Sequence, residues 1–223
     1  PKKNGDWAKW QRILSTSSSE ELWDGYYSFS ELPSYTNPES GWIQNANDPP
    51  FTSTFPAELN PSDYASHISP NYMIFRPQRS AKLIMNASNL TLDQFITLKH
   101  DTKSELALRL QDDFEGLKAL TKDSVTIAAL NVLTEWDASF DASSKGAVLF
   151  MNIIQRMGTA GFFEKKWSFE SPVSSPDGLM NPVQTLEIIK AVAQSQIDKL
   201  GNLSPEYGDL FRLKVGAHEF SGN

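Results

Sequence analysis

Cysteine is missing from all 223 positions of the sequence. Its absence excludes disulfide frameworks, cysteine-ligated zinc sites and thiol nucleophiles. It does not assign a compartment, because a periplasmic protein can also lack cysteine. Histidine is scarce as well: the three residues His67, His100 and His218 include no pair with the His-x-x-x-His spacing of a helical metal site. No metal site is therefore predicted from these residues.

Positive charge and long apolar runs are also in short supply. Lysine and arginine number 20 against 27 aspartates and glutamates, which gives a net charge of −7. Because phosphate contacts need a basic face, nucleic acid is not expected as a partner. No apolar run approaches the roughly 18 residues of a membrane span, so neither a membrane contact nor a signal peptide is expected. The chain begins at Pro1, which favours a processed product or an excised piece.

The residues that are present divide the chain into two parts near residue 76. Residues 1–75 hold most of the prolines and four of the six tryptophans, in stretches such as SELPSYTNPESG. Proline fixes φ, and Asn and Asp side chains bond to their own backbone, so this part is predicted to be extended and irregular. Residues 76–223 are predicted to be helical and to form a single structural unit.

Helical periodicity supports that second prediction. Thr91 or its neighbour is a predicted N-cap, and Asp123 or Ser124 is another. The fold class predicted is mainly α: a coil-rich, extended N-terminal segment followed by about six helices. The six segments with helical spacing are 76–88, 91–101, 104–120, 123–137, 144–158 and 181–201.

The last of these segments ends at Lys199 and Gly201, a typical helix stop. Its apolar side is predicted to be the buried one. Between this segment and the one before it, residues 161–182 are predicted to form a long loop with aromatic anchors. The apolar residues predicted for the buried side are Leu186, Ile189, Ala193 and Leu200.

Aromatic residues gather in the first part of the chain. They fit either a platform for a sugar or aromatic ligand or a set of anchors that hold the coil to a larger body, and the second role is the commoner one. The residues concerned are Trp7, Trp10, Trp23, Trp42, Tyr26, Tyr27 and Tyr35.

One short stretch of this part, NPESGWIQNANDPPF over residues 37–51, concentrates residues that bend the backbone. Asn45 and Asn47 lie two apart, so in an extended segment both amides point to one face, and Gly41 permits an unusual turn before them. A rigidly held amide NH₂ is a good donor to developing negative charge, because a fixed dipole needs no reorganisation. The same spacing also fits a network of Asx turns that caps the coil.

Four ordered runs add a resemblance to these patterns. They are LWDGYYSFSELPSYTNPESGWIQNANDPPF, IFRPQRSAKLI, LTLDQFITLKHDTKSELA and LTEWDASFDASSKGAVLF. Together they resemble the middle of the β chain of the penicillin acylase family, a group of N-terminal-nucleophile (Ntn) hydrolases. The resemblance covers roughly residues 20–160, and its most specific part is Asn-Pro-x-Ser-Gly-Trp-x-Gln-Asn-x-Asn-Asp.

In that family the nucleophile is a serine at the free N-terminus of the β chain, and its own α-amine acts as the base. The oxyanion is stabilised by a backbone N–H and by an Asn side chain, which the resemblance places at Asn47. A nearby family arginine is matched to Arg79, which is expected to hold Asn47 and the carboxylate side of the pocket. Asn45, Asp48 and Trp42 are expected to support the loop or the substrate.

The resemblance also implies what surrounds the chain. The nucleophile and the family's final strands are not in this sequence, so we expect an internal fragment, inactive alone, whose partners are the remaining α and β chain segments of the same precursor. The fragment would be the helical part of a larger αββα Ntn-hydrolase. Calcium is bound by many members, and Asp63 lies in the region of one ligand, but no residue is assigned to a metal.

The function implied is hydrolysis of a linear amide, such as an acyl-homoserine lactone or a penicillin, in a bacterial periplasmic or secreted enzyme. The sequence GWIQNANDPP is closer to the acyl-homoserine lactone branch. Two alternatives remain open. One is a stand-alone helical interaction module without catalysis, and the other is a hydrolase that uses a pair of carboxylates from the helices.

Overall fold

The computed structural model describes residues 25–158 and 162–221, together with positions 8, 11–13, 17 and 19. Its contacts divide the chain into two units. Unit 1 comprises Pro1–Ser88 and Trp167–Val173, and unit 2 comprises Asn89–Lys166 and Ser174–Asn223. The boundary predicted at residue 76 falls next to the start of a helix, whereas the division by contacts follows Ser88. Trp7, Trp10 and Trp23 of the predicted aromatic set lie outside the described residues.

Unit 1 is irregular along most of its described length. Its elements are η2 (Phe29–Glu31), η3 (Pro50–Thr52), η4 (Pro61–Asp63) and α2 (Phe75–Met85). The sequence explains the short turns, because Pro50 and Pro61 each open one with a φ already suited to it. The coil-rich N-terminal segment predicted from the sequence is therefore seen here.

Buried side chains tie this coil to α2. Phe51, Met73 and Ala81 are each at most 2% exposed, and the Phe51 ring lies 5.6 Å from that of Tyr64. Gln78 is fully buried and donates from Nε2 to the Met73 carbonyl at 3.0 Å. The bond from Gln78 thus holds the segment that leads into α2 against the first turns of the helix.

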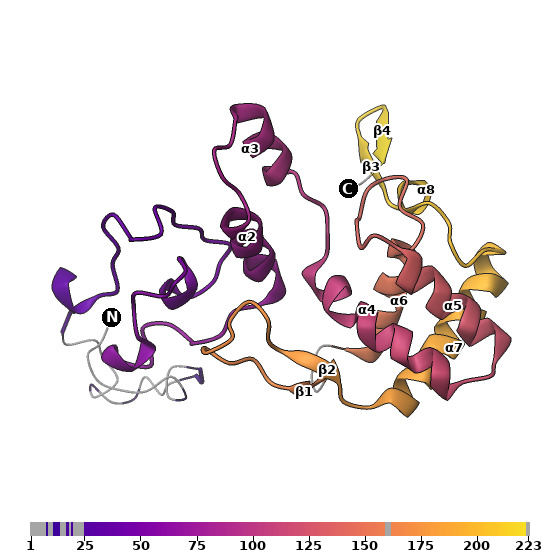
Figure 1. Ribbon diagram of the computed structural model, residues 1–223, viewed down its shortest axis with the longest axis horizontal. Coiled ribbons are helices and arrows are strands. Elements are labelled where there is room, and N and C mark those ends of the chain that lie inside the picture. The colour runs from indigo at the N-terminus through magenta and orange to yellow at the C-terminus, as the bar shows by residue number, and fades with distance from the viewer. Residues whose placement is uncertain are drawn as a thin grey trace. The chain divides into compact units, whose positions relative to one another are not determined.

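Unit 2 contains the remaining helices (Figure 1). Thr91 caps the first of them and Asp123 caps another by accepting from Thr126 N, which confirms both predicted caps. Gly201 ends the longest helix at a φ of 68°, as predicted. These helices are α3 (Leu92–Lys99), α4 (Glu105–Leu117), α5 (Ser124–Glu135), α6 (Ala147–Met157), α7 (Pro182–Leu200) and α8 (Tyr207–Leu210), with η5 (Lys118–Leu120) after α4.

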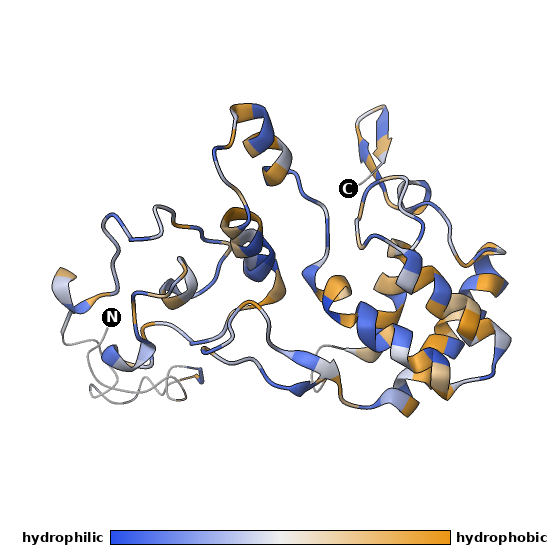
Figure 2. Ribbon diagram, in the orientation of Figure 1, coloured by the Kyte–Doolittle hydropathy of each residue, from blue (hydrophilic) through white to orange (hydrophobic). Residues whose placement is uncertain are grey.

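The core of unit 2 lies among α4, α5, α6 and α7, which carry much of the hydrophobic colour in Figure 2. Leu110, Leu130 and Ile153 are fully buried there, as is Ile189 of α7. α6 buries four consecutive residues from Ala147 to Phe150, which agrees with its prediction as a helix surrounded on several sides. The mainly α fold class is confirmed.

Two expectations need correction, and one pair of strands was not expected. The predicted loop 161–182 contains a short antiparallel pair, β1 (Phe163–Lys165) with β2 (Asp177–Leu179). A second antiparallel pair, β3 (Arg212–Val215) with β4 (His218–Ser221), was not predicted. Leu200, predicted to be buried, is 41% exposed because it sits in the last turn of α7, and Thr185 and Gln196 are buried on that helix instead.

None of the helices described is long and apolar enough to cross a membrane.

Candidate functional site

The Asn-rich loop of unit 1 opens with a tight turn. Gly41 N donates to the Pro38 carbonyl at 2.9 Å, and Gly41 has a φ of 76°, which favours glycine. Trp42 is half-buried after this turn, and its ring lies 6.2 Å from that of Phe55. Gln44 N then donates to the Ser53 carbonyl at 2.8 Å. That bond closes residues 44–53 into a loop whose ends are fixed.

Asp48 holds the inside of this loop. Its Oδ1 accepts from Ala46 N at 2.8 Å, and its Oδ2 accepts from Gln44 Nε2 at 2.8 Å and from Thr52 Oγ1 at 3.0 Å. Three donors thus bond to one carboxylate, and none of them carries a charge. The arrangement is rigid, since each donor comes from a different position around the turn.

The two asparagines have different roles in the loop, although their spacing predicted one common face. Asn45 bonds within the loop: its Oδ1 accepts from Asn47 N at 3.1 Å, an Asx turn, and its Nδ2 donates to the Asp48 carbonyl at 3.1 Å. Asn47 has a left-handed backbone, with a φ of 67°, and an exposed side chain. Asn is one of the few residues that accept this conformation readily.

The amide of Asn47 is oriented by an arginine. Arg76 Nη2 donates to Asn47 Oδ1 at 2.8 Å. A guanidinium only donates, so the oxygen of the amide must face Arg76 and the NH₂ group must face away. Within the described part of the chain, no hydrogen bond engages Asn47 Nδ2. The loop therefore presents a fixed, exposed pair of N–H donors.

The family resemblance predicts this contact for Arg79. Arg79 lies three residues further along α2 and is half-buried, and its role beside Asn47 stays a prediction. Residues three apart share one face of a helix, so periodicity alone does not separate Arg76 from Arg79. The distinguishing feature is position in the helix: Arg76 lies in the first turn of α2, next to the anchored loop.

Tyr35 braces the far side of the loop by donating from its phenol to the Pro50 carbonyl at 2.8 Å. Burial, and then the charge of Glu58 and the neighbouring Tyr64, raise the pKa of Tyr35 to about 12. The phenol is therefore protonated and able to donate at neutral pH. Tyr35 belongs to the aromatic residues predicted as a ligand platform or as anchors of the coil. Gln44 lies in the motif that carries the resemblance but has no predicted role, and neither has Thr52, because no local pattern marks a residue that bonds across a loop.

The described ranges hold no group of three or more histidines, aspartates or glutamates arranged to bind a metal ion. Asp63 is exposed in η4, where Asn60 caps the turn. Asp63 therefore belongs to no such group in this part of the chain.

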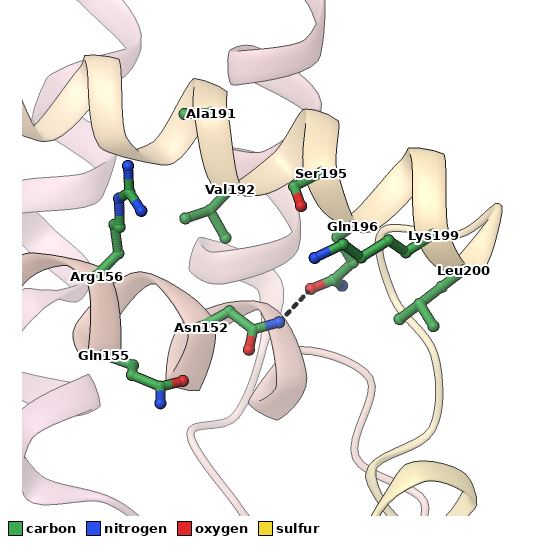
Figure 3. Close-up of a pocket in the computed structure, with 9 residues that line it drawn as sticks. All are labelled: Asn152, Gln155, Arg156, Ala191, Val192, Ser195, Gln196, Lys199 and Leu200. Carbon is green, nitrogen blue, oxygen red and sulfur yellow. Dashed lines mark hydrogen bonds between the residues drawn. The ribbon is translucent and has the colours of Figure 1, made fainter.

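A second candidate is a groove of about 710 Å³ between α6 and α7 in unit 2 (Figure 3). Asn152 Nδ2 donates to Gln196 Oε1 at 2.9 Å across it, and Arg156 and Lys199 supply positive charge. Ser195 is the only hydroxyl among its lining residues, which include no histidine or carboxylate to act as a base.

Comparison with known protein families bears on the Asn47 loop. The sequence model of one family, described as penicillin amidase, matches residues 1–209, which includes the loop and α2. The chain belongs to the penicillin amidase family. Membership in this family implies a hydrolase of the amidase type for the full-length protein. The predicted resemblance over residues 20–160 is confirmed and extends further in both directions.

Proposed function

We propose that the full-length protein hydrolyses a linear amide, and that Asn47 Nδ2 donates a hydrogen bond to the oxyanion formed on the amide carbonyl. The observation that carries this proposal is the bond from Arg76 Nη2 to Asn47 Oδ1 at 2.8 Å. It fixes the amide with its NH₂ group facing outward. A donor that is already oriented stabilises developing charge without reorganising, which is the main advantage of an oxyanion hole over water.

In the proposed reaction, the nucleophile comes from another segment of the same precursor. In the proposed mechanism, the Oγ of an N-terminal serine from another segment of the same precursor attacks the carbonyl, and its proton passes to the serine α-amine. The tetrahedral oxyanion forms beside Asn47. Its collapse expels the amine, which takes up the proton. Water then hydrolyses the acyl-enzyme and releases the carboxylic acid.

The substrate proposed is the amide of a small or fatty acyl group, with acyl-homoserine lactones favoured over penicillins because of the sequence GWIQNANDPP. The remaining α and β chain segments of the precursor are the proposed partners. By analogy with the penicillin acylase family, we also propose a bacterial periplasmic or secreted location and calcium binding by the full-length protein. This chain alone is expected to be inactive, since it lacks the nucleophile.

The test is an intact-mass and N-terminal analysis of the full-length gene product, incubated with an acyl-homoserine lactone and separately with a penicillin while free amine is measured. Two chains, one with a new N-terminal serine, together with release of amine, are expected. A single uncut chain that releases no amine from either substrate would overturn the proposal.

One observation favours the alternative, a helical interaction module. Leu92, Phe95 and Ile96 lie on one side of α3 and are 73%, 55% and 45% exposed. An exposed apolar stripe of this kind is typical of a surface that another protein covers. Substituting all three by polar residues separates the two functions: an interaction module loses its partner, whereas the amide hydrolase keeps its turnover once folded.

A further inference from the structure

Two buried side chains donate hydrogen bonds to the Asp48 carboxylate: Thr52 and Gln44. The Gln44 side chain donates both Nε2 hydrogens, one to Asp48 Oδ2 at 2.8 Å and one to the Thr52 carbonyl at 3.3 Å. Both partners only accept, so the orientation of the amide is fixed. Gln44 is 6% exposed, and its Oε1 is buried without a hydrogen-bond partner in the described residues.

An unpartnered buried acceptor destabilises the folded state, so its presence calls for an explanation. An apolar side chain of similar shape, such as methionine, would fill the same space without this cost. What methionine does not provide is the pair of N–H donors. A glutamine is therefore needed at this position for its hydrogen bonds to Asp48 and to the Thr52 carbonyl. Its Oε1 is left without a partner as a result of that orientation.

The bond to Asp48 connects Gln44 to the backbone beside Asn47. Asp48 Oδ2 accepts from Gln44, while Oδ1 of the same carboxylate accepts from Ala46 N at 2.8 Å. The carboxylate thus links a buried side chain to the backbone N–H of Ala46, the residue before Asn47. Asn47 has a φ of 67°, a left-handed conformation that Asn accepts more readily than most residues but that is still a minority state outside a fixed turn.

We propose that Gln44 is a positioning residue for the oxyanion hole: through Asp48, it holds the backbone at Asn47 in the left-handed conformation that directs the Asn47 amide at the reacting carbonyl. This inference rests on the proposed amide hydrolysis. Gln44 does not touch the substrate, so its effect on turnover passes through Asn47. It follows that removing Gln44 matters only while the Asn47 amide is present.

A double-mutant cycle in the full-length enzyme tests this dependence. Gln44→Met, Asn47→Gly and the double variant are compared with the wild type for kcat and KM by release of amine. Gln44→Met is expected to lower kcat by about 10- to 100-fold with KM little changed, as for a catalytic group displaced by about 1 Å. In the Asn47→Gly background, Gln44→Met is expected to have no further effect.

Gln111→Met is the matched control, because Gln111 is half-buried and donates from Nε2 to the Trp136 carbonyl at 2.6 Å in unit 2. It is expected to lower thermal stability without changing kcat. Equal losses of kcat for Gln44→Met in both backgrounds, or no loss in either, would overturn the positioning role. An Asn47→Gly variant with unchanged kcat would instead overturn the proposed function, so the two failures are distinguishable.

Gln44→Glu supplies a second readout that depends on pH. Asp48 is the one charged side chain among the hydrogen-bond partners of Gln44. The introduced carboxyl can donate to Asp48 Oδ2 only when protonated, and burial beside a carboxylate raises its pKa. The kcat of Gln44→Glu relative to wild type is therefore expected to be highest at acidic pH and to fall as pH rises. A ratio that does not change with pH would contradict the proposal.

Discussion

Arg76 and Asn47, 29 residues apart in sequence, are joined by a hydrogen bond of 2.8 Å from Nη2 to Oδ1. The bond determines which end of the amide is free: the oxygen faces the guanidinium, and the NH₂ group faces outward. A loop residue is thereby converted into an oriented donor. Both residues lie in unit 1, so the arrangement depends on contacts within that unit alone.

Removing the arginine should loosen this donor. Arg76→Ala in the full-length enzyme is expected to lower kcat by about 10- to 100-fold, because an amide that rotates freely is misplaced for part of the time. Steady-state release of amine measures the effect. Arg79→Ala is the comparison, since the two arginines share one face of α2, and the smaller loss is expected there. A larger loss for Arg79→Ala would transfer the orienting role to that residue.

Tyr35 makes the stability of the folded protein depend on pH in the alkaline range. Its pKa is raised from 10.0 to about 12, mainly by burial, so above pH 10 the unfolded chain loses this proton before the folded chain does. The stability that Tyr35 contributes is therefore complete below pH 10 and is lost as pH rises through about 12. Tyr35→Phe should cost about 1 kcal/mol below pH 10, for the lost bond to Pro50, with the difference shrinking above it. Urea unfolding of both proteins across this range measures it, and a constant difference would contradict the assignment.

A buried ion pair stabilises unit 2. Arg109 Nη2 lies 3.1 Å from Glu105 Oε1, with side chains 8% and 2% exposed. Glu105→Ala leaves a buried guanidinium without this carboxylate and is expected to lower the free energy of unfolding by about 3–5 kcal/mol. Glu115→Ala is the control on the same helix, because its pair with Lys118 leaves Glu115 64% exposed. That change is expected to cost less than about 1 kcal/mol. Equal losses of unfolding free energy for the two variants, measured by urea denaturation, would show that burial of the ion pair does not determine its contribution to stability.

Gly146 is required for close packing, since a Cβ there would collide with Cγ and Cβ of Trp136. Trp136 has little freedom to move, because its Nε1 donates to the Ser139 carbonyl at 3.0 Å and to Ser144 Oγ at 2.8 Å. Gly146→Ala is expected to destabilise the protein by about 1–3 kcal/mol. Gly116→Ala, in α4 with open space around it, should instead stabilise by about 0.5–1 kcal/mol. Thermal unfolding of the two variants should shift in opposite directions.

The helices of unit 2 were predictable because the apolar residues that each helix buries recur at helical spacing within a short stretch of sequence. Leu110, Phe114 and Leu117 recur at helical spacing and are all buried on α4. The helix caps were equally predictable, since a cap bonds to a nearby residue: the Asp123 side chain accepts a hydrogen bond from the backbone N–H three residues later. Periodicity was less informative at ends and edges: Leu200 lies in a last turn, and the apolar side of α3 is exposed among the described residues.

Pairings between distant residues were not predictable in the same way. β1 and β2 are three residues long each, and Phe163 pairs with Leu179 across a connection without helical or strand periodicity. The contacts of the candidate site are also non-local. Asn47 is predicted as the oxyanion donor because its motif is distinctive, and that role stays a prediction. The hydrogen bonds of Arg76, Tyr35 and Gln44 are not indicated by any sequence pattern, since they depend on which loop or helix turn each residue meets in space.

The most direct test of the account is the turnover of Asn47→Gly in the full-length enzyme. Glycine accepts the φ of 67° found at this position, so the variant removes the amide without straining the backbone. We predict that kcat falls by about 10²- to 10³-fold, as for the loss of an oxyanion donor, while KM and thermal stability change little. An Asn47→Gly enzyme with the kcat of the wild type would contradict the account.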